Sequence, residues 1–156
     1  MRRKVKNRNI AKADLKYNSA EVGKFINYCM WSGKKTTAIA IVYRSFDTIA
    51  EKMKTENPIE IFNTALKNTA PAVEVRSRRV GGANYQVPRE VRPERRLYLS
   101  MKWLIDAARS KKGAPMHEKL ADELIAASKN EGEAVRKKEN THKMAEANKA
   151  FSHFRF

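Results

Sequence analysis

The arginines of residues 72–96 are the side chains of this chain best suited to chemistry, and the chemistry they suit is anion binding. The segment from residue 73 reads VEVRSRRVGGANYQVPREVRPERR, and residues 72–96 carry a net charge of +4. A guanidinium group presents a planar fork of donors that binds phosphate in bidentate fashion and stacks on bases. Because so basic a segment does not suit a core, Arg76, Arg78 and Arg79 are predicted to face an external anion.

Residues that could support catalysis or hold a metal are few and scattered. His117, His142 and His153 lie far apart in sequence, and no CxxC or HExxH spacing occurs. Carboxylates such as Asp122 and Glu123 are interpreted as lying on solvated helix faces. The run GKKT lacks the preceding glycine of a phosphate-binding loop, because a tyrosine stands at that position. No catalytic site, metal site or cofactor is predicted, and the chain is not expected to be an enzyme.

The net charge indicates which class of partner the chain binds. The chain has 156 residues and a formal net charge of +16, of which +13 lies in residues 1–16, 72–96 and 133–156. A domain so far from neutrality repels itself unless a polyanion neutralises it, and nucleic acid is the commonest polyanion. A membrane partner is disfavoured because no apolar run approaches the roughly 20 residues needed to span. Residues 1–16 are predicted to be a basic flexible arm that orders on binding.

A β-hairpin is predicted over residues 72–88. Val73 and Val75 alternate with polar residues before Gly81-Gly82, and Tyr85 and Val87 alternate after it. A Gly-Gly pair between two such runs is typical of a tight hairpin turn, since both central positions need φ > 0. The proline that follows is expected to end the second strand. No other part of the chain predicts a strand.

Apolar residues at helical spacing predict six helices around the hairpin. The predicted helices span about residues 19–32, 37–54, 58–70, 93–110, 115–131 and 133–148. Gly33 is expected to end the first helix, Thr36 or Thr37 to cap the second, and Asn57 to cap the third. The predicted core residues are Val22, Phe25, Ile26, Cys29, Met30, Ala38, Ile41, Val42, Ser45, Phe46, Ile49, Met53, Ile61 or Phe62, Ala65, Leu66, Leu97, Met101, Leu104, Ile105, Ala108, Met116, Leu120, Leu124 and Ala127. The predicted fold is therefore mainly α, a single-domain bundle of six helices with one protruding β-hairpin between the third and fourth helices.

The carboxy-terminal residues 133–156 form a basic helix and tail. The helix has a single branched aliphatic residue, so it is expected to lie over the body and present a basic face. The tail carries phenylalanines at 151, 154 and 156, which either dock on the body or form an apolar plug for a partner. The hairpin is then the one element expected to project beyond the bundle.

Three basic elements on a nearly neutral body suit a structured RNA better than a straight duplex. Tyr85 is available to stack on a base, whereas Trp103 is interpreted as core or boundary. Two other classes remain open. One is an architectural DNA-binding protein with its hairpin in a minor groove. The other is a hydrolase with an unrecognised site.

Several runs resemble those of the small-subunit ribosomal protein seven family, bacterial type. They are SRRVGGANYQVP, RPERR, the GKK loop at Gly33–Lys35, and the ending RKKENTHKMAEANKAFSHFRF. The likeness extends from about Lys16 to Phe156 in order and spacing. The family fold, a bundle of six helices with a hairpin between the third and fourth, agrees with the elements predicted above. Two positions depart from the common pattern: Leu15 stands where many relatives have proline, and Ser32 where many have aspartate.

The resemblance implies a cytoplasmic, structural protein of the head of the small ribosomal subunit. It would bind the 3′ major domain of small-subunit rRNA, start head assembly, and lie by the mRNA exit channel and the exit-site tRNA. Its neighbours would be small-subunit proteins nine and eleven, the latter met by the carboxy-terminal tail. The rRNA-binding residues would be Arg2, Arg3, Lys4, Lys6, Arg8, Lys34, Lys35, Arg76, Arg78, Arg79, Arg92, Arg95, Arg96, Arg136, Lys137 and Lys138. The residues facing tRNA or mRNA would be Gly81, Gly82, Asn84, Tyr85, His142 and Lys143.

Overall fold

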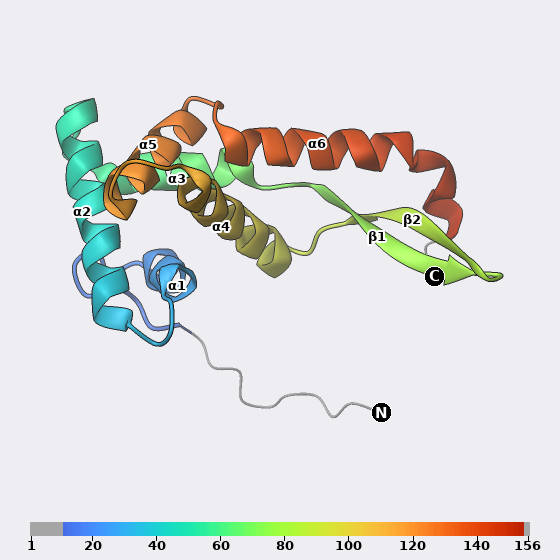
Figure 1. The fold of residues 1–156 in the computed structure, drawn as a ribbon, viewed down its shortest axis with the longest axis horizontal. Coiled ribbons are helices and arrows are strands. Elements are labelled where there is room, and N and C mark those ends of the chain that lie inside the picture. Colours follow the sequence, from blue (N-terminus) through green and yellow to red (C-terminus); the bar gives the residue numbers. More distant parts are fainter. Residues whose placement is uncertain (1–10, 155–156) are drawn as a thin grey trace.

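The computed structural model describes residues 11–154, and these form a helical bundle from which a hairpin and the last helix extend to one side (Figure 1). The helices are α1 (Ala20–Cys29), α2 (Lys35–Met53), α3 (Pro58–Thr69), α4 (Pro93–Ser110), α5 (Met116–Ser128), α6 (Glu133–Ala147) and the short 3-10 helix η1 (Lys149–Phe154). The strands are β1 (Val73–Val80) and β2 (Ala83–Glu90). Six α-helices with a hairpin between α3 and α4 confirm the predicted fold.

The core lies where the apolar stripes of α1 to α5 meet. Phe25, Phe46 and Phe62 are fully buried at its centre, with ring centroids 5.1 Å apart for Phe25–Phe62 and 5.5 Å for Phe46–Phe62. Each such side chain stabilises the fold by about 1.5–3 kcal/mol through burial. Of the two alternatives left open in the third helix, Phe62 is buried and Ile61 is only partly buried. Helical spacing therefore identified the inward face of α1, α2, α4 and α5, and the structure decided between the two alternatives in α3.

The start of the last helix is fixed by a buried carboxylate. Glu123 on α5 is fully buried, and its Oε1 accepts a hydrogen bond from the backbone N–H of Ala134 at 3.0 Å. Its Oε2 lies 2.6 Å from Nζ of Lys111. A carboxylate at a helix N-terminus also interacts favourably with the helix dipole. The prediction that Glu123 lies on a solvated face was wrong, although its spacing from Leu120 and Ala127 puts it on the apolar stripe of α5.

The turn between α1 and α2 differs from the prediction. Helix α1 ends at Cys29, three residues early, because the backbone of Met30 is extended; Ser32 and Gly33 then adopt positive φ, 50° and 75°. The N–H of Lys34 then donates to the carbonyl of Trp31 at 3.0 Å, which closes a tight turn. Helix α2 begins directly at Lys35 with no side-chain cap, so the predicted threonine cap was wrong.

Residues 11–16, which the sequence assigned to a flexible arm, pack on the bundle. Asp14 is buried, and its carboxylate accepts hydrogen bonds from the backbone N–H groups of Lys16 and Tyr17, both at 3.1 Å, and from the Tyr43 hydroxyl at 2.6 Å. A side chain at Gly23 of α1 would collide with the backbone of this segment. The basic residues of 1–10 lie outside the described residues.

The hairpin is a two-stranded antiparallel sheet with Gly81 and Gly82 at its turn, at φ 56° and 89°. It is longer than predicted, because β2 continues through Pro88 to Glu90. Pro88 pairs with Val75. Proline is tolerated there because both strands of a two-stranded sheet are edge strands, whose outer N–H groups have no ladder partner.

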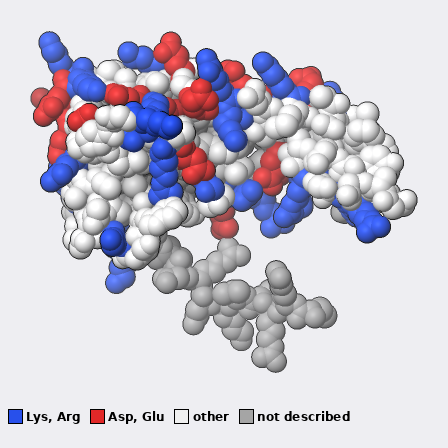
Figure 2. All heavy atoms as spheres, viewed as in Figure 1, with Lys and Arg blue, Asp and Glu red and all other residues white. Residues whose placement is uncertain are grey.

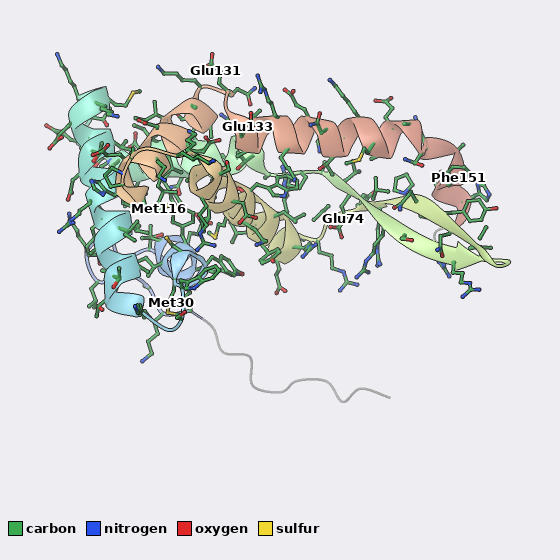
Figure 3. All side chains as sticks on the ribbon, viewed as in Figure 1. Met30, Glu74, Met116, Glu131, Glu133 and Phe151 are labelled. Carbon is green, nitrogen blue, oxygen red and sulfur yellow. The ribbon has the colours of Figure 1, made fainter. Side chains whose placement is uncertain are left out.

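Helix α6 does not lie over the body for its whole length. Its first turn packs Val135 on the core, and the helix then runs beside the hairpin, where η1 folds back onto β2 (Figure 1). The rings of Tyr85 and Phe151 lie 5.3 Å apart (Figure 3 labels Phe151). The prediction that the hairpin alone projects was therefore wrong. An isolated hairpin is marginal in water, and α6 with η1 supplies the cover it needs.

Candidate nucleic-acid interface

The predicted cationic residues occupy three parts of the described molecule: the hairpin and its base, the turn between α1 and α2, and α6. Figure 2 shows Lys and Arg along the lower edge of the hairpin, and Lys and Arg beside a few Asp and Glu between the hairpin and the bundle. Over α6 and the top of the bundle, Lys and Arg are mixed with Asp and Glu. The least compensated positive surface in this view therefore follows the hairpin side.

The hairpin presents arginines on both of its faces. In the register of the two strands, Arg78 pairs with Tyr85 and Arg79 pairs with Asn84. Successive residues of a strand point to opposite faces, so Arg76 and Arg78 share one face while Arg79 lies on the other. All three arginines are exposed. Arg76 and Arg78 lie on the face that Tyr85 shares with η1, and Arg79 lies on the opposite, uncovered face.

The base of the hairpin is joined to α4 by one of the predicted arginines. Nε of Arg95 lies 3.3 Å from Oε2 of Glu74 on β1, and its guanidinium lies 5.0 Å from the ring centroid of Tyr98. These contacts hold Arg95 in place between strand and helix. Arg92 and Arg96 flank it and are exposed. The start of α4 thus brings three arginines to the point where the hairpin leaves the bundle.

The turn between α1 and α2 presents Lys34 and Lys35, both exposed. The first turn of α2 contains no acidic residue to compensate them. Trp31 precedes them and its side chain is also exposed. Sequence reasoning overlooked Trp31, although its position off the apolar stripe of α1 and beside the GKK run was a usable signal. Cations and an aromatic ring therefore share this turn.

The three basic residues predicted on α6 have different environments. Nζ of Lys138 donates to the backbone carbonyl of Asn68 at 2.7 Å, which satisfies the carboxyl end of α3. Arg136 forms an ion pair with Glu133 at 2.9 Å within the helix. Lys137 is exposed. Lys138 therefore has a structural contact, whereas Lys137 and Arg136 face solvent.

The residues predicted to face tRNA or mRNA do not form one cluster. Gly81, Gly82 and Asn84 are exposed at the hairpin tip, while Tyr85 is half-buried against η1. His142 instead lies at the hairpin base, half-buried, with Lys143 exposed beside it on α6. Burial, together with the charges of Lys138 and Arg96, lowers the pKa of His142.

The predicted arm residues Arg2, Arg3, Lys4, Lys6 and Arg8 lie outside the described residues.

Among residues 11–154, no three His, Cys, Asp or Glu side chains are grouped so that they could hold a metal ion. Nor does this part of the chain contain a helix long and apolar enough to cross a membrane. Cys29 is a packed thiol, as predicted, and burial raises its pKa.

Comparison with known proteins gives consistent matches over the whole length of the chain. A family model described as ribosomal protein S7p/S5e matches residues 1–149. Small ribosomal subunit protein uS7 of Thermotoga neapolitana is 54% identical over 156 residues, covering 100% of each chain. The protein of that name from Phenylobacterium zucineum is 58% identical over 143 residues, 92% of this chain and 91% of the relative. That from Thermotoga maritima is 54% identical over 155 residues, 99% of each. The matched region includes the bundle, the hairpin and α6.

Proposed function

The chain belongs to the ribosomal protein S7p/S5e family, and from that premise we propose that it binds the 3′ major domain of small-subunit rRNA. The family is a structural, non-enzymatic, RNA-binding component of the small ribosomal subunit that serves translation. In the proposal, binding to the 3′ domain starts assembly of the subunit head in the cytoplasmic ribosome. The bound protein then lies beside the mRNA exit channel and the exit-site tRNA.

The observation that carries the proposal is that exposed arginines lie on a hairpin held in place by neighbouring helices. Arg76, Arg78 and Arg79 are exposed along a hairpin that α6 and η1 cover on one side. Arg95 fixes the hairpin base to α4 through Glu74. A preorganised cationic surface binds an irregular polyanion with less ordering cost than a flexible one. This supports rRNA binding at the hairpin base and along its strands.

The remaining predicted contacts take complementary roles in the proposal. Lys34 and Lys35, together with Arg92 and Arg96, bind rRNA phosphates at the bundle, and the basic residues of 1–10 add further phosphate contacts. The exposed tip at Gly81-Gly82 faces the exit-site tRNA and mRNA. The carboxy-terminal tail meets small-subunit protein eleven, and protein nine is the neighbour within the head.

The direct test is the affinity of the purified protein for the isolated 3′ domain RNA and for an unrelated RNA of equal length. We expect preference for the 3′ domain at moderate salt, with log affinity falling linearly against log salt concentration. Chemical footprinting of the 3′ domain should show protections that disappear when the hairpin arginines are replaced by alanine. Equal affinity for the two RNAs at every salt concentration would refute the proposal.

A truncation measures how much the amino-terminal residues contribute to RNA affinity. Because residues 11–16 pack on the bundle through Asp14, the deletion should stop at residue 10. Loss of residues 2–10 is expected to lower both the affinity and the slope of the salt dependence, since phosphate contacts are lost. An unchanged slope would remove residues 2–10 from the interface while leaving the hairpin assignment intact.

A further inference from the structure

Trp31 is the most unusual apolar side chain on the described surface. It lies in the turn between α1 and α2, and its side chain is 72% exposed. Indole is a large apolar group, and most tryptophans are largely buried. The exposed position therefore forgoes stabilisation that burial would provide. Figure 3 labels the preceding residue, Met30, which marks this turn at the lower end of α2.

The geometry of the turn holds the indole outward. Ser32 and Gly33 take left-handed backbone conformations, and Lys34 donates its N–H to the Trp31 carbonyl at 3.0 Å. From the end of α4, the guanidinium of Arg109 lies 5.3 Å from the indole centroid. Nη2 of Arg109 also donates to the carbonyl of Cys29 at 3.2 Å. Backbone and guanidinium together restrict where the ring can lie, so its exposure is part of the fold.

The surroundings of the ring are cationic. Lys34 and Lys35 are exposed immediately after the turn. Between Glu21 and Asp47 the sequence contains no acidic residue. The other tryptophan, Trp103, is half-buried in a cleft whose lining mixes lysine and arginine side chains with Asp106 and Glu133. Of the two indoles, Trp31 is the more exposed, and its neighbours in the sequence are cations without a nearby acidic residue.

We propose that Trp31 is a stacking platform for one unpaired RNA base, with Lys34 and Lys35 binding the phosphates that flank that nucleotide. Every base has a π-face, so stacking on an aromatic side chain tolerates any sequence, while lysines follow the backbone. A protein partner would require apolar neighbours around the indole. The residues from Ser32 to Thr37 are instead small, polar or cationic, and all are exposed. The inference rests on the proposed RNA binding and adds a second, single-stranded contact far from the hairpin.

The test uses the full chain and two single-stranded probes, a short oligoribonucleotide and an abasic oligomer with the same phosphate backbone. In a Trp103→Phe variant, Trp31 is the one remaining tryptophan, and excitation at a wavelength that tyrosine does not absorb reports on it alone. We expect the oligoribonucleotide to quench the Trp31 fluorescence and the abasic oligomer to leave it nearly unchanged. Independently of fluorescence from the protein, a labelled oligoribonucleotide should bind the Trp31→Leu variant about tenfold more weakly than wild type, the loss of one stacked base. Trp31→Phe should recover most of that affinity.

Several outcomes would overturn the inference. They are equal quenching by both probes, no quenching by the oligoribonucleotide, or unchanged affinity in the Trp31→Leu variant with intact far-UV circular dichroism. Quenching by isolated small-subunit proteins and not by the oligoribonucleotide would assign Trp31 to a protein contact instead. The experiments distinguish failure of the stacking platform from failure of the proposed rRNA binding. If Trp31→Leu still prefers the 3′ domain RNA with wild-type affinity, the platform is refuted and rRNA binding stands. If the wild type shows no preference among long RNAs, rRNA specificity is refuted whatever the quenching result.

Discussion

Nε2 of His142 accepts a hydrogen bond from the backbone N–H of Ala72 at 3.1 Å, so the last helix holds the chain where it leaves α3 for the hairpin. One turn earlier on α6, Lys138 donates to Asn68 at the end of α3. The imidazole must be neutral to accept, because a protonated ring has donors alone. The lowered pKa of His142, caused first by burial and then by the charges of Lys138 and Arg96, keeps that acceptor available at neutral pH.

Acidification should weaken this contact. The pKa of His142 is lower in the folded protein than in the unfolded chain, so the unfolded state binds the proton more readily. The stabilisation is fully present above about pH 6.5, the unfolded value, and is lost as pH falls through the folded pKa. Urea unfolding at pH 8 and pH 5.5 measures the loss. His142→Gln keeps an acceptor that does not titrate, so the variant should lose less stability on acidification than wild type. Equal losses would show that His142 is not the group responsible.

Replacement of Glu123 by alanine should destabilise the fold by about 2–3 kcal/mol, because the Ala134 N–H and the Lys111 ammonium lose a charged acceptor. Glu123→Gln should cost less, since it keeps one oxygen for Ala134. The matched control is Asp122→Ala on the preceding residue. Its ion pair with Lys52, at 2.6 Å, joins two half-exposed side chains and is worth at most about 1 kcal/mol. Denaturant unfolding measures all three, and similar costs for Glu123→Ala and Asp122→Ala would contradict the buried role of Glu123.

Phe151→Ala should loosen the hairpin without unfolding the bundle. The variant removes the ring that lies 5.3 Å from Tyr85, whereas the main core does not include Phe151. We expect faster amide hydrogen exchange in residues 73–90 and unchanged protection in the helices of the core. Leu15→Ala, at a fully exposed side chain, is the control and should change neither. Uniformly faster exchange throughout the chain would show that η1 supports the whole fold.

Arg78→Ala combined with Arg79→Ala should weaken binding to the 3′ domain RNA and leave the helical far-UV signal intact. The slope of the log affinity against log salt concentration should fall by about 1 for each arginine that contacts a phosphate. The double variant Lys52→Ala, Lys102→Ala removes the same charge from cations paired with nearby carboxylates on the bundle, and it should change the slope less. Equal effects of the two double variants would mean that net charge alone governs binding.

The sequence was sufficient for the fold because its main elements are encoded locally. Spacing of Phe25 and Phe46 relative to their apolar neighbours identified the inward faces of their helices, whereas it left Ile61 and Phe62 as alternatives in the third helix; Gly81-Gly82 located the hairpin turn. Each of these signals lies within a few neighbouring residues of the sequence. It can therefore be identified without knowing which helices and strands contact one another.

Contacts between distant elements could not be predicted in the same way. Nothing near Glu123 in the chain indicates that Lys111 and the start of α6 would converge on it. The course of α6 was also missed, because small residues such as Ala145 give a weak helical pattern even though Ala145 is buried. Candidate phosphate ligands were identified by residue type, yet only the folded chain separates Lys138, which contacts Asn68, from Lys137, which faces solvent.

The double attachment of the hairpin has a mechanical consequence. The hairpin contacts α6 near its base through His142 and contacts η1 near its tip through Phe151. We therefore expect the two strands and the helix to bend together. A helix packed against two strands resists bending more than the strands alone, so we expect the hairpin and α6 to move as one unit. We expect a force on Gly81-Gly82 to reach α6 through these two contacts as well as through the strands. It arrives in the bundle at the junction where Glu123 holds the first turn of that helix.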